Sequence, residues 1–319
     1  MQRRVVITDY TFPDIDRETA AAEAAGCSLQ AHQCRTAEEV AEAVAGADMA
    51  IVQFAPLDKA AIAGMADRPA LVRYGIGYDN IDVTAARELG ATVGYVPDYC
   101  TDEVAEHTCA SLLTLLRKLP ALDGSVRAGR WAAVAAAKPI LPFQKTTVGF
   151  FGFGQIGRAV HSRLKGFGFA FAVADPALSQ TEAQQLGLER LSADELFRRS
   201  DAICLHAPAT AETKSFVNAE RLSGMRPNAV LVNPARGALI DEQALADALG
   251  RGLIAGAALD VFETEPLPEA SPLRDAPNLL LTPHAAWYSE EAIGRLQALV
   301  AEDISNHFAG KGLRKPVPA

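Results

Sequence analysis

The chain has 319 residues, 49% of them hydrophobic, which is enough apolar sequence to bury the cores of about two domains. The formal net charge of −9, with no run of lysine or arginine, argues against a nucleic acid or an anionic membrane as partner. No stretch approaches the ~20 apolar residues of a membrane span. The five cysteines form no C-x-x-C pair, so we expect reduced thiols, a cytoplasmic protein and no metal site.

The first hundred residues alternate between apolar strands and alanine-rich helices. An apolar strand so close to the N-terminus indicates folded structure there and no signal peptide. Strands separated by helices at this spacing predict a parallel sheet with helices on both faces. We expect strands at residues 5–8, 50–54, 70–74 and 91–96, and helices at 17–25, 36–45 and 83–89.

A long helix over residues 101–119 follows the segment 97–99, which ends this first unit. Acidic residues in the first turn of the helix and basic residues in its last turn suit the helix dipole. Residues 119–146, rich in glycine, alanine and proline, form either an excursion or a dimer-contact arm.

A second alternating unit begins at Thr147. Its strands are expected at residues 148–151, 169–174, 202–205, 229–232, 257–259 and 279–281. A final helix over 289–308 either packs with the helix at 101–119 or returns to the first unit. The sequence therefore predicts two doubly wound parallel-sheet domains.

A glycine motif lies between the strand at 148–151 and the helix that follows it. Its glycines permit a tight turn, close approach of a pyrophosphate and close helix–strand packing. The phosphates would lie against free N–H groups at the start of the helix. The motif is Gly152, Phe153, Gly154, Gln155, Ile156 and Gly157.

An acidic residue, Asp175, ends the next strand at roughly the 20-residue spacing that suits the ribose hydroxyls of a dinucleotide. No arginine follows it to receive a 2′-phosphate. The sequence therefore predicts NAD as the cofactor in preference to NADP.

Two of the six histidines lie just past predicted strands, where open α/β sheets bind ligands. His206 leads into Ala207 and Pro208, a small turn suited to bordering a cofactor with backbone. His284 is the better candidate for proton transfer. His107, in the long helix, is at least as well explained by packing.

The same edge of the second sheet is expected to carry an arginine and three carboxylates. Arg236 follows the strand at 229–232, and its guanidinium could bind a carboxylate through two hydrogen bonds. Asp260, Glu263 and Glu265 follow the next strand, and one of them could hydrogen-bond an imidazole and set its pKa. The sequence pattern alone does not choose among the three acids.

Together these motifs resemble the D-isomer-specific 2-hydroxyacid dehydrogenase family over essentially the whole chain. The nearest likeness is to the branch with the C-terminal-binding-protein co-repressors, because VRYGIGYDNID and HAAWYSE occur together. Pro234 departs from the small residue that many relatives have before Ala-Arg-Gly. The motifs are GIGYDNID (75–82), VPDYCTDEVAEHT (96–108), GFGQIG (152–157), Asp175, VNPARGALID (232–241), AALDVFETEP (257–266) and LTPHAAW (281–287).

The resemblance implies a Rossmann NAD-binding domain at 100–288, with a flavodoxin-like substrate domain at 1–99 plus 289–319 that closes over it across a cleft. It also implies a homodimer, formed through the 101–146 region. In the second domain, Arg236 would bind the substrate carboxylate and carbonyl oxygen, Glu265 would pair with His284, and His284 would pass the proton.

The resemblance assigns further contacts to both domains. The cofactor would meet Pro234, Ala235 and, at its nicotinamide end, Asp260. In the first domain the backbone of Gly75, Ile76 and Gly77 would bind the carboxylate, with Arg73 assisting.

The substrate and one alternative function stay open at this stage. Trp287, three residues after His284, either walls a pocket for an apolar substrate side chain or packs the hinge. Glyoxylate and hydroxypyruvate remain possible. A phosphorylated acid would call for extra cations and, by the resemblance, an appended regulatory domain that we do not expect. The alternative function is an NAD(H)-responsive co-repressor-like binding protein with little turnover.

Overall fold

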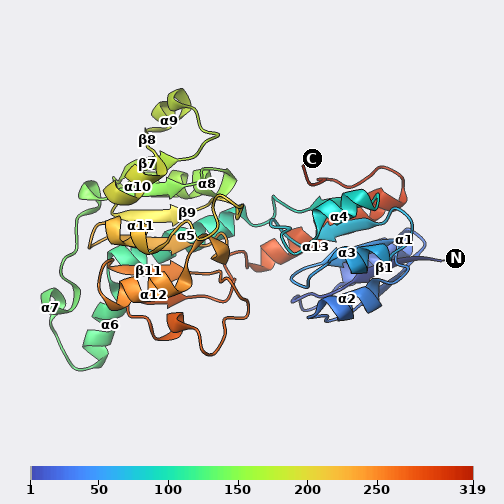
Figure 1. Ribbon diagram of the computed structural model, residues 1–319, viewed down its shortest axis with the longest axis horizontal. Helices are drawn as coiled ribbons and strands as arrows, with labels where there is room; N and C mark the ends of the chain where they lie inside the picture. Colours follow the sequence, from blue (N-terminus) through green and yellow to red (C-terminus); the bar gives the residue numbers. More distant parts are fainter. Residues whose placement is uncertain (1, 319) are drawn as a thin grey trace. The chain divides into compact units, whose positions relative to one another are not determined.

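The computed structural model describes residues 2–318 (Figure 1). The chain forms two compact units, unit 1 from Met1–Cys100 with Ser289–Ala319, and unit 2 from Thr101–Tyr288. The first segment of unit 1 ends at Cys100, one residue later than the predicted domain boundary. That unit 1 handles the substrate stays a prediction.

Unit 1 is built on five parallel strands in the order β2-β1-β3-β4-β5. This is the flavodoxin-like order, in which the strand sequence reverses between β1 and β3. The strands are β1 (Arg3–Ile7), β2 (Cys27–Ala31), β3 (Met49–Val52), β4 (Ala70–Arg73) and β5 (Thr92–Tyr95). The helices are α1 (Asp16–Ala24), α2 (Ala37–Val44), α3 (Lys59–Ala63), α4 (Val83–Glu88) and α13 (Glu290–Phe308).

Two of these elements are absent from the sequence-based prediction. Strand β2 is an edge strand whose sequence CSLQA has a single fully buried residue, so it lacks the apolar run of the central strands. Helix α3 has only five residues, and the side chain of Asp58 caps it by accepting the amide of Ala61. Both are too short or too polar for a periodic signal.

The last helix, α13, belongs to unit 1. Of the two expected alternatives, the return to the first unit is therefore confirmed. The Arg17 side chain donates to the carbonyl of Gly294 at 3.2 Å, and Gln297 Nε2 donates to the carbonyl of Asp14 at 2.8 Å. Beyond α13 the chain pairs with β5 through the amide of Val317 and the carbonyl of Val93. The chain therefore completes unit 1 only after it has built unit 2.

Asp9 holds the loop that leaves β3 at the point where the strand order of unit 1 reverses. Its carboxylate, in a residue only 7% exposed, accepts the amides of Gln53, Phe54 and Ala55 at 3.0, 2.6 and 3.2 Å. Amides past the end of a strand have lost their ladder partners, and Asp9 supplies the acceptor.

Replacing Asp9 by Asn should destabilise unit 1 by about 1–3 kcal/mol, because an amide NH₂ group would face backbone donors that need an acceptor. Urea unfolding followed by circular dichroism measures this change. Asp67→Asn is the matched control, since Asp67 is exposed and should change stability by less than about 0.5 kcal/mol. Equal stabilities for the two variants would contradict this role of Asp9.

Unit 2 is built on seven parallel strands in the order β12-β11-β10-β9-β6-β7-β8. Read from β8, six of them follow the Rossmann order, with β12 added beside β11, and the order reverses between β6 and β9. Both sheets are therefore doubly wound and parallel, as predicted. The strands are β6 (Thr147–Phe151), β7 (Ala170–Ala174), β8 (Glu189–Arg190), β9 (Ala202–Leu205), β10 (Val230–Asn233), β11 (Gly256–Leu259) and β12 (Leu279–Leu281).

Helices cover both faces of this sheet (Figure 1). The long first helix ends at Leu116, three residues earlier than expected, because Lys118 adopts a left-handed conformation with φ of 52° and a new helix follows. The helices are α5 (Thr101–Leu116), α6 (Leu119–Arg127), α7 (Ala133–Ala137), α8 (Gln155–Leu164), α9 (Gln180–Leu186), α10 (Ala193–Arg199), α11 (Ala219–Gly224) and α12 (Glu242–Gly250).

Neither a membrane span nor a metal cluster is found in the part of the chain that the structure describes. No helix among residues 2–318 combines the length and the apolar character needed to cross a membrane. Within the same residues, no three His, Cys, Asp or Glu side chains are grouped so that they could hold a metal ion.

Candidate active site

The glycine loop after β6 packs directly against the loop after β9. Gly152 has φ of +89°, and a Cβ atom there would lie 2.6 Å from the amide nitrogen of Ala207. Gly154 caps α8, and a Cβ atom on it would meet nothing within 4 Å. One glycine thus brings the two loops together, and the other leaves an open face at the start of α8, where a pyrophosphate fits.

Asp175, at the end of β7, binds the glycine loop. Its Oδ2 accepts the amide of Phe153 at 2.6 Å, and its Oδ1 accepts the amide of Ala177 at 2.8 Å. The carboxylate therefore stays beside the loop, where its remaining lone pairs can accept ribose hydroxyls. A 2′-phosphate at the same place would meet a negative charge.

His206 borders this loop as a neutral imidazole. Its ring stacks on Phe150 with centroids 6.3 Å apart, and burial lowers its pKa to about 3. Its Nε2 is buried and has no partner among the described residues, so it is available to a cofactor bound at this loop. His161 packs in the same aromatic cluster, and its pKa falls to about 4, mainly through burial.

The loop after β10 presents Arg236 beside the loop after β11. The buried Asn233 shapes it, donating to the carbonyl of Arg236 at 2.8 Å and accepting the amide of Ala235 at 3.0 Å. A Cβ atom on Gly237 would lie 1.9 Å from the carbonyl carbon of Phe262, so only glycine permits this approach. Arg236 donates to the carbonyl of Ala235 at 2.6 Å and is close enough to Glu265 to favour its ionised form.

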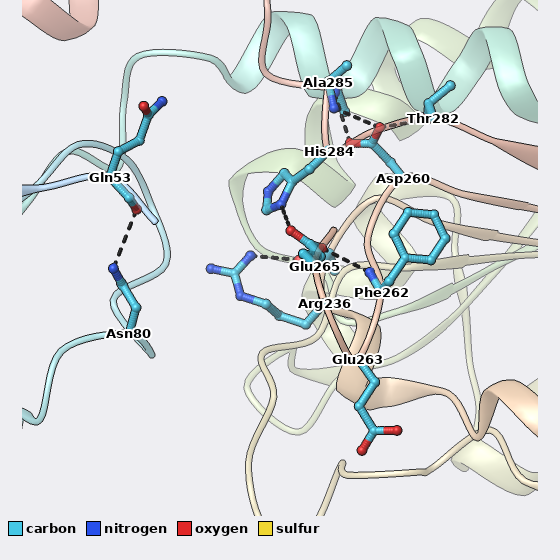
Figure 2. A network of polar contacts seen from close by, with 12 residues as sticks. Gln53, Asn80, Arg236, Asp260, Phe262, Glu263, Glu265, Thr282, His284 and Ala285 are labelled. Carbon is cyan, nitrogen blue, oxygen red and sulfur yellow. Dashed lines mark hydrogen bonds and ion pairs between the residues drawn. The ribbon is translucent and has the colours of Figure 1, made fainter. Parts of the chain in front are cut away.

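Glu265 and His284 form an ion pair at this edge of the sheet (Figure 2). His284 Nδ1 lies 2.7 Å from Glu265 Oε2, and Glu265 Oε1 accepts the amide of Phe262 at 2.9 Å. Burial raises the pKa of Glu265, but the hydrogen bond and charge of His284, the Phe262 amide and Arg236 together bring this pKa below its ordinary value. Glu265 is therefore a carboxylate that accepts a hydrogen bond from Nδ1–H of His284, which leaves Nε2 as the nitrogen that can gain or lose a proton.

The three candidate acids after β11 lie in different surroundings. Glu265 meets His284, whereas Glu263 is exposed and its amide donates to Glu242. Asp260 is 2% exposed, and its carboxylate accepts the amides of Ala285 and Ala286, both at 2.8 Å. Asp260 thus holds the loop that carries His284, a role the sequence did not indicate.

The backbone of His284 itself is in the left-handed region, with φ of +52°. Its amide donates to the carbonyl of Asp260 at 2.7 Å and is also 3.1 Å from the carbonyl of Thr282. Left-handed non-glycine residues cost free energy and persist where surrounding contacts fix them. Here those contacts come from Asp260.

The candidates in unit 1 lie at the end of β4, whose last residue is Arg73, and just beyond it. Arg73 is 8% exposed and donates to the carbonyl of Tyr74, and its guanidinium lies 5.8 Å from the Phe54 ring centroid. The amide of Gly75, which was expected to face the substrate, instead donates to the carbonyl of Arg73 at 2.8 Å. Within residues 2–318, the amides of Ile76 and Gly77 have no protein acceptor, so they alone keep the predicted donor role.

Two contributors were not picked out from the sequence. Thr282 Oγ1 donates to Asp260 Oδ1 at 2.6 Å, and His107 Nε2 lies 3.2 Å from the same hydroxyl oxygen. The available signal for Thr282 was its position at the end of a strand, just before His284. The sequence around His107 indicated packing and gave no signal of this contact, because its partner is 175 positions away in the chain.

A family model matches residues 109–286 of the chain, and its description is D-isomer specific 2-hydroxyacid dehydrogenase, NAD binding domain. The chain belongs to this family. It is thereby a member of a family of oxidoreductases, and unit 2 is its NAD-binding domain.

The curated relatives of the chain include enzymes named D-3-phosphoglycerate dehydrogenase. D-3-phosphoglycerate dehydrogenase of Mycobacterium tuberculosis is 38% identical over 275 residues, which cover 86% of this chain and 52% of the relative. The chain thus spans about half the length of the curated relatives it matches. The likeness to the co-repressor branch stays a prediction, and the relatives described here are named as dehydrogenases or reductases.

Two solved structures resemble the whole chain. D-lactate dehydrogenase from Aquifex aeolicus, complexed with NAD and lactic acid, is 27% identical, with a TM-score of 0.86 and 96% of each chain covered. An NADPH-dependent glyoxylate/hydroxypyruvate reductase from Sinorhizobium meliloti, with NADP and malonate, is 30% identical, with a TM-score of 0.84, 99% of this chain and 97% of that one covered.

Gly154→Ala should lower the affinity for NADH at least about tenfold while leaving stability nearly unchanged, because the added methyl enters open space where the pyrophosphate fits. Fluorescence titration and thermal unfolding measure the two effects. Gly166→Ala is the control, since its Cβ would also meet nothing within 4 Å but lies outside the loop. Unchanged NADH affinity in Gly154→Ala would place the cofactor elsewhere.

Proposed function

We propose that the protein interconverts a 2-oxo acid and a D-2-hydroxy acid with NAD(H) as cofactor. The observation that carries this proposal is the 2.7 Å ion pair of His284 and Glu265 beside Arg236, at the carboxyl edge of an NAD-binding sheet. An acid–base group, a carboxylate that sets its protonation, and a cation for the substrate are what this chemistry requires.

Each side chain has one proposed step. Arg236 binds the carboxylate and the carbonyl oxygen of the 2-oxo acid, and the amides of Ile76 and Gly77 in unit 1 offer further donors to the carboxylate. Bound NADH supplies the hydride. His284, protonated on both nitrogens, gives the Nε2 proton to the oxygen that becomes the hydroxyl, while Glu265 stabilises the imidazolium and keeps the ring in place. Oxidation of the hydroxy acid runs through the same groups in reverse.

The cofactor preference is proposed to be NAD over NADP. Asp175 stands at the ribose end of the glycine loop with its carboxylate fixed by two backbone amides. A fixed negative charge there favours free ribose hydroxyls and opposes a 2′-phosphate. One similar structure contains NADP, so this preference follows from Asp175 and not from the family.

For the substrate, we propose an unphosphorylated 2-oxo acid with an apolar side chain. Trp287 follows His284 by three residues, is partly exposed, and presents its indole edge-on to Tyr288 at 5.9 Å. We propose that this indole lines the substrate pocket, where it would favour an apolar substituent. The similarity to a phosphoglycerate dehydrogenase makes 3-phosphohydroxypyruvate the competitor to test.

His284→Gln should lower kcat by roughly 10²–10⁴-fold with little change in NADH affinity, because glutamine fills similar space but carries no transferable proton. Turnover is measured by NADH absorbance over a panel of 2-oxo acids: apolar ones, glyoxylate, hydroxypyruvate and its 3-phosphate. His32→Gln, at an exposed histidine, is the control. The proposal is wrong if the wild type binds NADH tightly but reduces no member of the panel.

We also propose a homodimer formed through residues 119–141. Figure 1 shows α7 and its flanking loops extending away from the sheet of unit 2 and its covering helices. Trp131 is 93% exposed and Val134 75%, and Leu119, Val126 and Leu141 are exposed in the same segment. A cluster of large apolar side chains in water is costly, and a second copy of the chain would cover it.

Trp131→Glu should convert the dimer to a monomer, because a charge replaces the most exposed aromatic side chain of this segment. Light scattering after gel filtration measures the mass. Leu89→Glu places the same charge on an exposed leucine of unit 1 and should leave the dimer intact. A monomeric wild type would exclude the proposal directly.

We infer a cytoplasmic location from the cysteines. None of the five forms a disulfide bond within the described residues, and four of them are buried. Burial raises the pKa of Cys109 to about 11, so this thiol stays protonated and inert. Buried cysteines outside disulfide bonds are typical of a reducing compartment.

A further inference from the structure

Three polar side chains connect helix α5 to the loop that carries His284. His107 Nε2 lies 3.2 Å from Thr282 Oγ1, which lies 2.6 Å from Asp260 Oδ1. All three belong to unit 2, and no step proposed above uses His107 or Thr282. The helix starts at Thr101 and the loop ends near Tyr288, so both lie next to the points where the chain passes between the units.

The direction of these hydrogen bonds follows from proton counting. A threonine hydroxyl has one proton, and Thr282 donates it to the carboxylate of Asp260. Its oxygen can then only accept, so His107 must donate from a protonated Nε2. The nearest oxygen of Asp260 is 3.9 Å from His107 Nε2, which is too far for a direct hydrogen bond, so Thr282 is the link.

The end of this chain of hydrogen bonds sets the backbone of His284. Asp260 accepts the amides of Ala285 and Ala286 through its carboxylate, and the amide of His284 through its carbonyl. Figure 2 shows the Asp260 carboxylate with its partners Thr282 and Ala285. These contacts hold His284 at a φ of +52°, which a histidine does not prefer. A carboxylate that rotated would release both amides that follow His284.

We propose that His107 is a positioning residue for the candidate acid–base group. Its Nε2–H orients the hydroxyl of Thr282, the hydroxyl orients the carboxylate of Asp260, and the carboxylate fixes the loop that places His284 against Glu265. The catalytic consequence rests on the proposed function, whereas the positioning is a property of unit 2 alone.

The experiment compares His107→Gln with His107→Glu in the full chain. The two side chains are nearly equal in size, but glutamine can donate to Thr282, whereas ionised glutamate can only accept and adds a negative charge near Asp260. Hydrogen exchange of the peptide covering residues 282–287 is the first readout. We expect wild-type exchange in His107→Gln and roughly tenfold faster exchange in His107→Glu, about the effect of one lost hydrogen bond. Exchange over residues 152–157 should not change.

Kinetics give the second readout. In His107→Glu, kcat should fall roughly tenfold with KM for NADH and for the 2-oxo acid within about twofold, and His107→Gln should restore kcat. Thr282→Ser keeps the hydroxyl and should behave as wild type, whereas Thr282→Val should match His107→Glu. A residue that only supported the fold would lower NADH affinity and stability as well.

The outcomes separate this proposal from the proposed function. Unchanged exchange in His107→Glu overturns it whatever the kinetics show. Faster exchange with wild-type kcat also overturns it, since the loop would not need fixing. Faster exchange in a protein whose wild type reduces no 2-oxo acid supports the positioning by His107 and removes the proposed function instead.

Discussion

The candidate site depends most on the carboxylate of Asp260. This side chain is buried at the end of β11, where a bare charge would be strongly disfavoured, and it is tolerated because a hydroxyl and two backbone amides donate to it. The same hydrogen bonds turn the chain after β12 back on itself and leave His284 facing Glu265. Without Asp260, no contact within the loop itself would favour the left-handed backbone of His284, and the ion pair with Glu265 depends on how this loop is held.

The same solution appears at three strand ends. A parallel sheet leaves the amides of its exit loops without ladder partners, and a short acidic side chain from a neighbouring strand can accept several of them. Asp9 does this for the loop after β3, Asp175 for the glycine loop, and Asp260 for the His284 loop. In each case the carboxylate joins loops from two different strands. Loop residues that would contact a ligand are thus held in place by acidic side chains that need not contact the ligand themselves.

Much of this was predictable from the sequence, and the parts that were not have a common cause. Strands β9 and β12 were predicted at their observed bounds, because each is a short apolar run bounded by turn residues. The contact of Glu265 with His284 was reached only through family resemblance; the pattern alone left Asp260 and Glu263 equally open. What separates them is the partner of each carboxylate: Asp260 accepts two backbone amides, Glu265 contacts the imidazole of His284, and Glu263 is exposed. Those partners come from loops brought together only by the folded sheet, as with His107 and Thr282.

The histidines show why one candidate for proton transfer survives. His206 and His161 are buried among phenylalanines with no carboxylate beside them, and their lowered pKa values keep them neutral across the physiological range. A neutral imidazole with no acid partner can accept a hydrogen bond from a cofactor or fill a core, but it does not hold the proton that a reduction consumes. His284 differs in its neighbour. Glu265 stays ionised because His284, Arg236 and the Phe262 amide outweigh its burial, so a negative charge is always present to stabilise the imidazolium. Position at the strand end makes His206 and His284 look alike in sequence, and the carboxylate on the adjacent loop distinguishes them.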